Sequence, residues 1–477
     1  MCLHTRKEKS TGCRNWAAMT YDLVISDGRI IADNGASTGN IGIAAGKIAK
    51  LSEDPLDGDE VIDARGQIVL PGAVDLHVHF NEPGRSHWEG WGSGSRAAAA
   101  GGVTTVVEMP LNAVPPTTTA AALDAKLAAA RGQSVVDFAL WGGLITDNLH
   151  HLADLAEGGV IGFKAFMSHS STEEFTHVED GLLYEGLCRL RELGHFLAVH
   201  AESNAITQNR MARLRAAGRR DRRAWGEARP PLAELEAIHR ALFLAREAQC
   251  RLHVVHMSLP EGAQMIQAAK GAGQGVTVET CAHYLALTDD DLARLGPVAK
   301  CAPPLRDAAR QQGLWQAVLK GQIDCITSDH SPCPTEDKTQ GDDDIWQAWG
   351  GITGIQTLVP LMLTEGVHRR GMSLDHVVAL LSTTPAKIAG LLPRKGVVRE
   401  GADADLMIVD LDREWTVDRE WLASRHPHSP FIGRRMKGWI TRVLVRGATV
   451  AREGEVTTSA TGTWLRREVA APKHIYM

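Results

Sequence analysis

The stretch AVDLHVHF at 73–80 is the first of eight short apolar runs, most of them followed by a helical stretch. The other seven runs are VTTVVEMP (103–110), VDFALWG (136–142), VIGFKAFM (160–167), FLAVHAE (196–202), RLHVVHMS (251–258), GVTVETCAHY (275–284) and IDCITSDH (323–330). Helical patterns occur at 120–132, 182–194, 230–248 and 260–273. This alternation predicts an α/β fold, a (β/α)8 TIM-like barrel over residues 71–392. The alternative is a doubly wound open sheet, but no Gly-rich phosphate-binding turn follows the first run.

Two β-rich regions flank the predicted barrel. Residues 20–70 alternate short β-rich runs with glycine turns and predict a small antiparallel sheet, and residues 393–457 repeat the pattern. We expect the two regions to pair into one small β-sandwich-like domain built from both chain ends. Residues 1–19 are interpreted as a disordered leader, and residues 458–477 as a C-terminal tail, either disordered or strapped to a partner subunit.

Composition excludes several classes of protein. The formal net charge is −6, so nothing indicates a nucleic-acid partner. No apolar run approaches the roughly 18 residues that cross a bilayer, so no membrane association is expected. The 8 cysteines are scattered without a CxxC pair, and the first residues lack the apolar core of a secretory signal. A reduced, cytoplasmic location therefore fits best.

Residues with metal-binding side chains end several of the predicted strands. In a (β/α)8 barrel the catalytic groups come from the carboxyl ends of the strands. His77 and His79 are two residues apart, so both imidazoles point to one face of a strand and can reach one metal ion. His200, His256 and Asp329 end three further runs. Each of these residues taken alone could have a purely structural role. Their joint occurrence at the ends of barrel strands favours a metal site instead.

Lys164 lies inside the apolar run VIGFKAFM, where an unpaired ammonium is costly to bury. Three interpretations stay open: a lysine that reaches the barrel mouth, a Schiff-base nucleophile, and an amine that has added CO2 to form a carbamate. A carbamate would be an anionic ligand that bridges two cations. Two metal ions sharing a hydroxide would then generate a nucleophile, with Asp329 as the catalytic base and later acid.

The motifs that carry these residues resemble those of the amidohydrolase superfamily, and within it the cyclic amidases (dihydroorotases, hydantoinases and allantoinases). They are PGAVDLHVHFNEPGR (71–85), GFKAFM (162–167), VHAES (199–203), HVVHMS (253–258), CAHYLALT (281–288), ITSDHSPCP (326–334) and GADADLMIVD (401–410). The resemblance implies two divalent metal ions per chain. His77, His79 and Asp329 would hold one, His200 and His256 the other, and carboxylated Lys164 would bridge them. Zinc suits these ligands best, although Co, Ni, Fe or Mn also fit.

Departures from the group patterns narrow the expected substrate. Dihydroorotases usually have an arginine where Asn81 stands here, so the anchor for a substrate carboxylate is missing. Hydantoinases usually have a tyrosine five residues after the bridging lysine, where this chain has His169. The motifs HFNEPGR, MPLN (109–112) and AWGGITGIQ (348–356) look like those of allantoinases. That resemblance implies substrate contacts from Asn81, Asn112, His169, Ser331 and Thr353.

The resulting prediction is a metal-dependent cyclic amide hydrolase of the allantoinase kind. A metal-bridging hydroxide would attack the hydantoin ring of allantoin and give allantoate. The alternatives are a hydantoinase or dihydropyrimidinase acting on related cyclic ureides, and a non-catalytic scaffold relative that keeps the barrel. The expected partners are a small-molecule substrate and further copies of the chain, in a homodimer or homotetramer.

Overall fold

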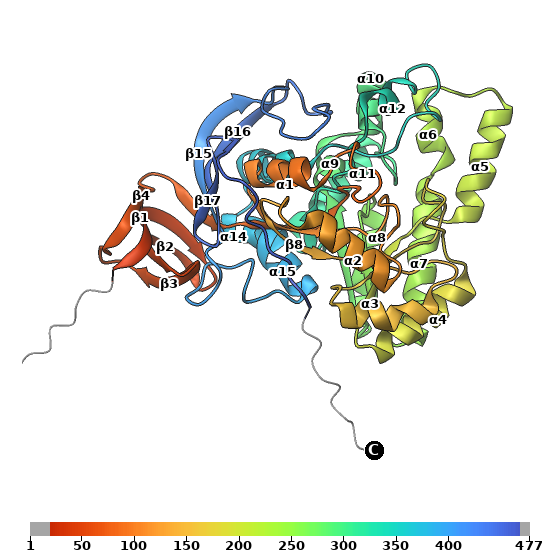
Figure 1. Cartoon of the computed structure of the whole chain (residues 1–477). Coiled ribbons are helices and arrows are strands. Elements are labelled where there is room, and N and C mark those ends of the chain that lie inside the picture. Colours follow the sequence, from red (N-terminus) through yellow and green to blue (C-terminus); the bar gives the residue numbers. More distant parts are fainter. Residues whose placement is uncertain (1–19, 468–477) are drawn as a thin grey trace, which may run out of the picture.

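The computed structural model describes residues 20–467 and confirms the predicted (β/α)8 barrel (Figure 1). Its strands are β6 (Ala73–Val78), β7 (Val103–Glu108), β8 (Asp137–Leu140) with β9 (Gly142–Gly143), β10 (Phe163–Phe166), β11 (Phe196–His200), β12 (Arg251–Val254), β13 (Val276–Cys281) and β14 (Cys325–Thr327). All of their pairings are parallel. A parallel bridge between Val78 and His330 closes the barrel, so the first and last strands meet at the level of the predicted site.

Helices surround this barrel, and several of them match the predicted ones. They are α1 (Trp91–Ala100), α2 (Ala120–Ala130), α3 (Leu152–Gly158), α4 (Asp180–Glu192), α5 (Asn204–Ala216), α6 (Arg222–Ala228), α7 (Pro231–Glu247), α8 (Pro260–Gly271), α9 (Ala282–Ala286), α10 (Asp289–Leu295), α11 (Ala308–Leu319), α12 (Thr335–Thr339), α13 (Leu358–Leu361), α14 (Leu374–Val378) and α15 (Thr384–Ala389). Met362–His368 and Ala379–Thr383 are π-helical. Within residues 20–467, no helix combines the length and apolarity that a membrane crossing requires.

A second sheet lies beside the barrel and takes strands from both ends of the chain, shown in red and blue in Figure 1. Its strands are β1 (Tyr21–Ala32), β2 (Gly35–Ala44), β3 (Lys47–Ser52), β4 (Gly58–Asp63), β5 (Ile68–Pro71), β15 (Leu406–Thr416), β16 (Arg435–Val445), β17 (Ala448–Arg452) and β18 (Glu455–Val456). β5 lies between β1 and β15 and so joins the two ends. The expected purely antiparallel pairing of residues 20–70 is wrong in part, because β1 pairs with β4 and β5 in parallel.

The predicted leader lies outside the described residues, and so do residues 468–477 of the predicted tail. The part of the tail that is described packs against the barrel. Thr463 and Leu465 exchange backbone hydrogen bonds with Phe138 of β8 at 2.7–3.0 Å. The tail therefore covers one edge of the strand that begins at Asp137.

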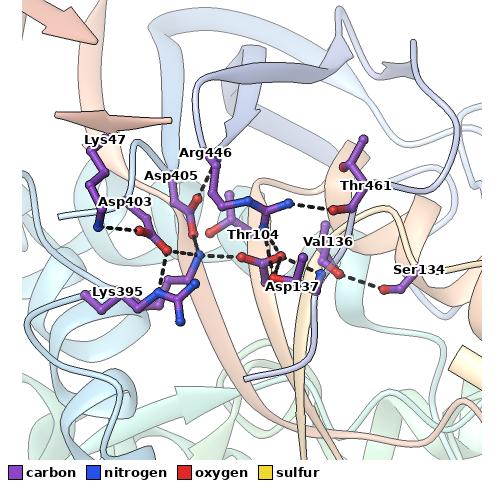
Figure 2. A network of polar contacts seen from close by, with 12 residues as sticks. Lys47, Thr104, Ser134, Val136, Asp137, Lys395, Asp403, Asp405, Arg446 and Thr461 are labelled. Atoms are coloured by element: carbon purple, nitrogen blue, oxygen red, sulfur yellow. Dashed lines mark hydrogen bonds and ion pairs between the residues drawn. The ribbon is translucent and has the colours of Figure 1, made fainter. Parts of the chain in front are cut away.

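A buried ionic network joins this tail, the barrel and the second sheet (Figure 2). The Lys395 ammonium lies 2.5 Å from Asp137, 2.6 Å from Asp405 and 3.0 Å from Asp403. Burial lowers the pKa of Lys395, but the charges of the three carboxylates outweigh burial and raise that pKa above its ordinary value. Arg446 adds a second cation, which binds Asp137 and the Thr461 carbonyl. The network fixes the base of the barrel, at the end opposite the predicted site.

Replacing Lys395 by methionine is expected to destabilise the protein by about 3–5 kcal/mol, because it leaves buried carboxylates without their shared cation. The measurement is the free energy of unfolding in urea. Lys47→Met is the matched control, since Lys47 contacts the same Asp403 at 3.1 Å but is 54% exposed. That control should cost at most about 1 kcal/mol. Equal losses of stability in the two variants would contradict the prediction that the buried Lys395 contributes more than the exposed Lys47.

Candidate active site

The carboxyl ends of β6 and β14 bring three of the predicted ligands together. The Nε2 atoms of His77 and His79 each lie 3.3 Å from Oδ1 of Asp329. The ligand atoms of the three residues all lie within 4.8 Å of one another, which one metal ion could bridge. The backbone N–H of His79 donates to the His330 carbonyl at 2.8 Å, so the bond that closes the barrel also sets the height of this cluster.

The ends of β11 and β12 place a second pair of predicted ligands beside the first cluster. Nδ1 of His200 faces Nε2 of His256 at 3.0 Å. The ring centroids of His77 and His256 are 5.3 Å apart, so the two clusters are neighbours. Behind His200, its Nε2 contacts the buried Glu202 carboxylate at 2.8 Å, and Glu202 is paired with Arg229. That arrangement is the carboxylate–histidine pair that commonly orients a metal-binding imidazole.

Lys164 on β10 is fully buried, as the apolar run around it predicts. Its Nζ has no hydrogen-bond partner among the residues that the structure describes. Burial lowers the pKa of Lys164 to about 8, although the charges of Glu279 and Asp329 act in the opposite direction. Burial likewise lowers the pKa of His77, His200 and His256, and the Lys164 charge adds to the effect at each. The lysine thus lies close to both clusters.

Several residues of the site have a backbone conformation that side chains other than glycine rarely adopt. The φ angles are 36° at His256, 45° at Asp329, 65° at Asn81 and 59° at Asn112. Such strain costs on the order of 1–3 kcal/mol per residue and concentrates at active sites, where the surrounding structure holds it in place. At these residues the chain turns sharply, so the side chains point in directions that a regular strand would not give them.

A cavity of about 580 Å³ opens above the two clusters, within the size range typical of small-molecule sites. The four histidines and Asp329 line it. Three of the five predicted substrate contacts line it as well: Asn112, His169 and Ser331. The cavity therefore offers metal-binding nitrogen and oxygen atoms beside further hydrogen-bonding side chains.

Asn81 and Thr353, the two other predicted contacts, do not line this cavity. Asn81 is fully buried, and its amide donates to the Pro332 carbonyl at 3.4 Å, which ties the turn after β6 to the segment after Asp329. Thr353 is 4% exposed and its carbonyl accepts a bond from Ser429. Both residues are therefore buried in the protein and do not reach the cavity.

Sequence reasoning missed the aromatic rim of the cavity. Trp88 and Trp349 meet edge to face with ring centroids 4.6 Å apart. Arg85 lies over Trp88 and donates to the Asn112 carbonyl at 2.8 Å. These residues come from loops far apart in the chain. Trp88 follows the motif HFNEPGR and Trp349 lies within AWGGITGIQ, but neither motif shows that the two rings meet.

Two buried lysines hold the loop that carries Trp349. Lys300 donates to the carbonyls of Ile345 and Ala348, at 2.8 and 2.5 Å. Lys338 donates to the Trp349 carbonyl at 2.9 Å. Neither lysine has a carboxylate within ion-pair distance in the described part of the chain. The loop is thus fixed through its backbone, which leaves its side chains to shape the rim.

A cluster of imidazoles and a carboxylate at the carboxyl end of a (β/α)8 barrel is the arrangement that metal-dependent hydrolases use. A family model described as the amidohydrolase family matches residues 68–450. The chain belongs to this family.

Curated relatives and solved structures agree with this membership. The chain is 47% identical to an allantoinase of Rubrobacter xylanophilus, over 94% of this chain and 98% of the relative. It is 42% identical to an allantoinase of Escherichia coli K12, over 91% of this chain and 95% of the relative. The structure of an L-hydantoinase (dihydropyrimidinase) from Arthrobacter aurescens matches with a TM-score of 0.92 at 39% identity, over 94% of this chain and all of that chain.

Proposed function

We propose that this protein is an allantoinase, which hydrolyses the hydantoin ring of allantoin to give allantoate. One observation carries the proposal: the carboxyl ends of the barrel strands place four histidines and Asp329 around one cavity. Curated relatives that are 42–47% identical to this chain are allantoinases. A scaffold relative would have no use for this cluster. The function thus requires a metal centre, a proton carrier and a pocket for a neutral ureide.

The residues present fit a binuclear metal centre, both in the types of ligand atom they offer and in the positions of the two clusters. His77, His79 and Asp329 would hold one divalent ion, and His200 and His256 the other. Lys164, which has no hydrogen-bond partner among residues 20–467, would bridge the two as a carbamate: its neutral amine forms a C–N bond to CO2 and releases one proton. Zinc is the metal that this ligand set favours, with Co, Ni, Fe or Mn as alternatives. Bound divalent ions lower the pKa of water and polarise a carbonyl.

Asp329 is the residue that we assign to proton transfer. Within the described residues, both of its histidine contacts use Oδ1, which leaves Oδ2 to accept a proton from the attacking water. The same oxygen would then deliver that proton to the ring nitrogen as the C–N bond breaks. Burial disfavours the Asp329 carboxylate, but His77 and His79 outweigh burial and lower the pKa of Asp329 to about 2. Asp329 therefore enters the reaction as a base.

The cavity suits a neutral substrate rich in hydrogen-bond donors and acceptors. Asn112 and Ser331 offer an amide and a hydroxyl, and His169 an imidazole, beside the predicted metal centre. No arginine stands at position 81, so a carboxylate-bearing ring such as dihydroorotate loses the anchor that it would need. A hydantoinase is the second candidate, and the close match to the L-hydantoinase structure favours it.

We also propose that the protein works in the cytoplasm as a homodimer or homotetramer. The cysteines in residues 20–467 are all free thiols, which supports a reducing compartment. Leu232 and Phe243 on α7 are 63% and 50% exposed, which suits a contact with another copy. Sedimentation of the purified protein measures the assembly directly.

The test of the function is a comparison of turnover on allantoin, hydantoin, dihydrouracil and dihydroorotate, with metal counted per chain on the same sample. We expect about two metal ions per chain and the highest kcat/KM on allantoin. Removing the metal with a chelator should abolish turnover, and adding zinc with bicarbonate should restore it. Higher kcat/KM on hydantoin or dihydrouracil would select the second candidate. A chain that binds no metal and turns over none of the four compounds would be a scaffold.

A further inference from the structure

A fully buried carboxylate, Glu279 on β13, lies behind the predicted metal centre and has no part in the chemistry described above. It contacts groups on or directly after two other barrel strands, β6 and β12. Oε1 lies 2.5 Å from Nδ1 of His77 and 3.2 Å from the backbone nitrogen of His256. Oε2 lies 3.1 Å from Nε2 of His253. One side chain therefore touches a predicted ligand from each of the two clusters.

The contact with His77 determines which of its nitrogens carries the proton. A carboxylate only accepts hydrogen bonds, so Nδ1 of His77 must be the donor. The lone pair of His77 is then on Nε2, the atom that lies 3.3 Å from Asp329 Oδ1. Metal binding requires an unprotonated nitrogen at that place. Glu279 thus fixes the imidazole in the tautomer that a metal ion at the cluster needs.

The contact with His256 acts on the backbone instead. The φ of 36° at His256 is costly for a side chain with a Cβ, and a bond from its N–H helps to hold it. The acceptor is the same Oε1 that contacts His77. A shift of Glu279 would therefore move a ligand in each cluster at once, which couples the two halves of the centre.

His253, Glu279 and Cys325 also lie close enough together to suggest a metal site of their own. Their other contacts argue against it. Both Glu279 oxygens already accept hydrogen bonds, and Nδ1 of His253 contacts the Thr277 hydroxyl at 2.8 Å. Burial raises the pKa of the Cys325 thiol well above its ordinary value, so no thiolate is offered. The group is a hydrogen-bonded support for the centre above it.

We propose that Glu279 is a positioning residue, which sets the tautomer of His77 and the backbone of His256 and so joins the two metal-binding clusters into one centre. This proposal rests on the proposed function, because it needs a metal centre to support. Outer carboxylates of this kind typically contribute a factor of about 10–100 to metal affinity. Glu279 is expected to contribute to the binding of both ions.

The test compares Glu279→Met, which keeps the side-chain length but removes both acceptor oxygens, with the unaltered protein. The readouts are metal affinity, measured by competition with a chelator, and the visible spectrum of the cobalt-loaded form. We expect affinity to fall about 10- to 100-fold for both ions and the cobalt bands to shift. His253→Gln is the matched control: it alters the same buried network but keeps the His77 contact, so affinity and spectrum should stay close to those of the unaltered protein. Glu279→Asp keeps the charge but shortens the reach, and should also weaken binding.

Two results would overturn the proposal. One is a folded Glu279→Met protein with unchanged affinity and cobalt bands. The other, decisive where Glu279→Met does not fold, is a Glu279→Asp protein that binds both ions as the unaltered protein does. If the unaltered protein itself binds no metal, the proposed function fails instead, so the two failures are distinguishable.

Discussion

Replacing Asp329 by asparagine is expected to lower kcat on allantoin by about 100- to 10,000-fold, the range that general base catalysis supplies. The amide keeps the size of the side chain and one oxygen that can face His77 and His79, so part of the metal should remain bound. It cannot accept the proton of the attacking water or return it to the ring nitrogen. The loss should therefore appear in kcat more than in KM.

The measurement is steady-state hydrolysis of allantoin by proteins with matched metal content. Asp337→Asn is the control, since Asp337 lines the same cavity but is no member of the metal-binding cluster. Its turnover should stay near that of the unaltered protein. A metal-loaded Asp329→Asn protein within tenfold of normal kcat would remove the proton-carrier role.

The barrel could be predicted from the sequence because its strands are fully buried and therefore appear as continuous apolar runs. Strand ends could be read with equal ease, since His77, His200 and Lys164 interrupt or end such runs. The pairing of the strands in the second sheet could not be predicted, because the alternation of residues along a strand does not show which strand lies beside it. The parallel pairing of β1 with β4 is such a case.

Which predicted substrate contacts line the cavity could not be read from the sequence. At Asn81, where φ is 65°, the side-chain amide donates to the Pro332 carbonyl. A motif gives the residue type at this position but not the dihedral angle. Glu279 was missed for a different reason: within GVTVETCAHY it looks like an ordinary strand residue, and only the fold brings His77, 202 positions away in the chain, against it.

The rim of the cavity shows the same limit. Trp88 and Trp349 are in contact only because the first and last strands of the barrel are neighbours. Their pairing depends on closure of the barrel and on loop 345–351, whose carbonyls Lys300 and Lys338 hold. A contact between two loops leaves no pattern within either of them.

Replacing Lys164 by alanine is expected to remove nearly all bound metal and nearly all activity. The substitution deletes a fully buried amine that has no hydrogen-bond partner in the described part of the chain, so no hydrogen bond is broken. What is lost is the anionic bridge that its carbamate would form. Without it, the four imidazoles would have to hold two cations with Asp329 as the only remaining carboxylate of the predicted ligand set, which burial makes unfavourable.

The identity of the bridge is tested by chemical rescue of the Lys164→Ala protein. A short carboxylic acid such as acetate or propionate should enter the space left by the side chain and restore part of the metal content and activity, because it supplies the two oxygens of a carbamate. Methylammonium is the matched control, since it restores the amine but no anion. Rescue by methylammonium and not by acetate would favour a lysine that acts as a cation or nucleophile. Full activity of Lys164→Ala without any addition would exclude the bridge.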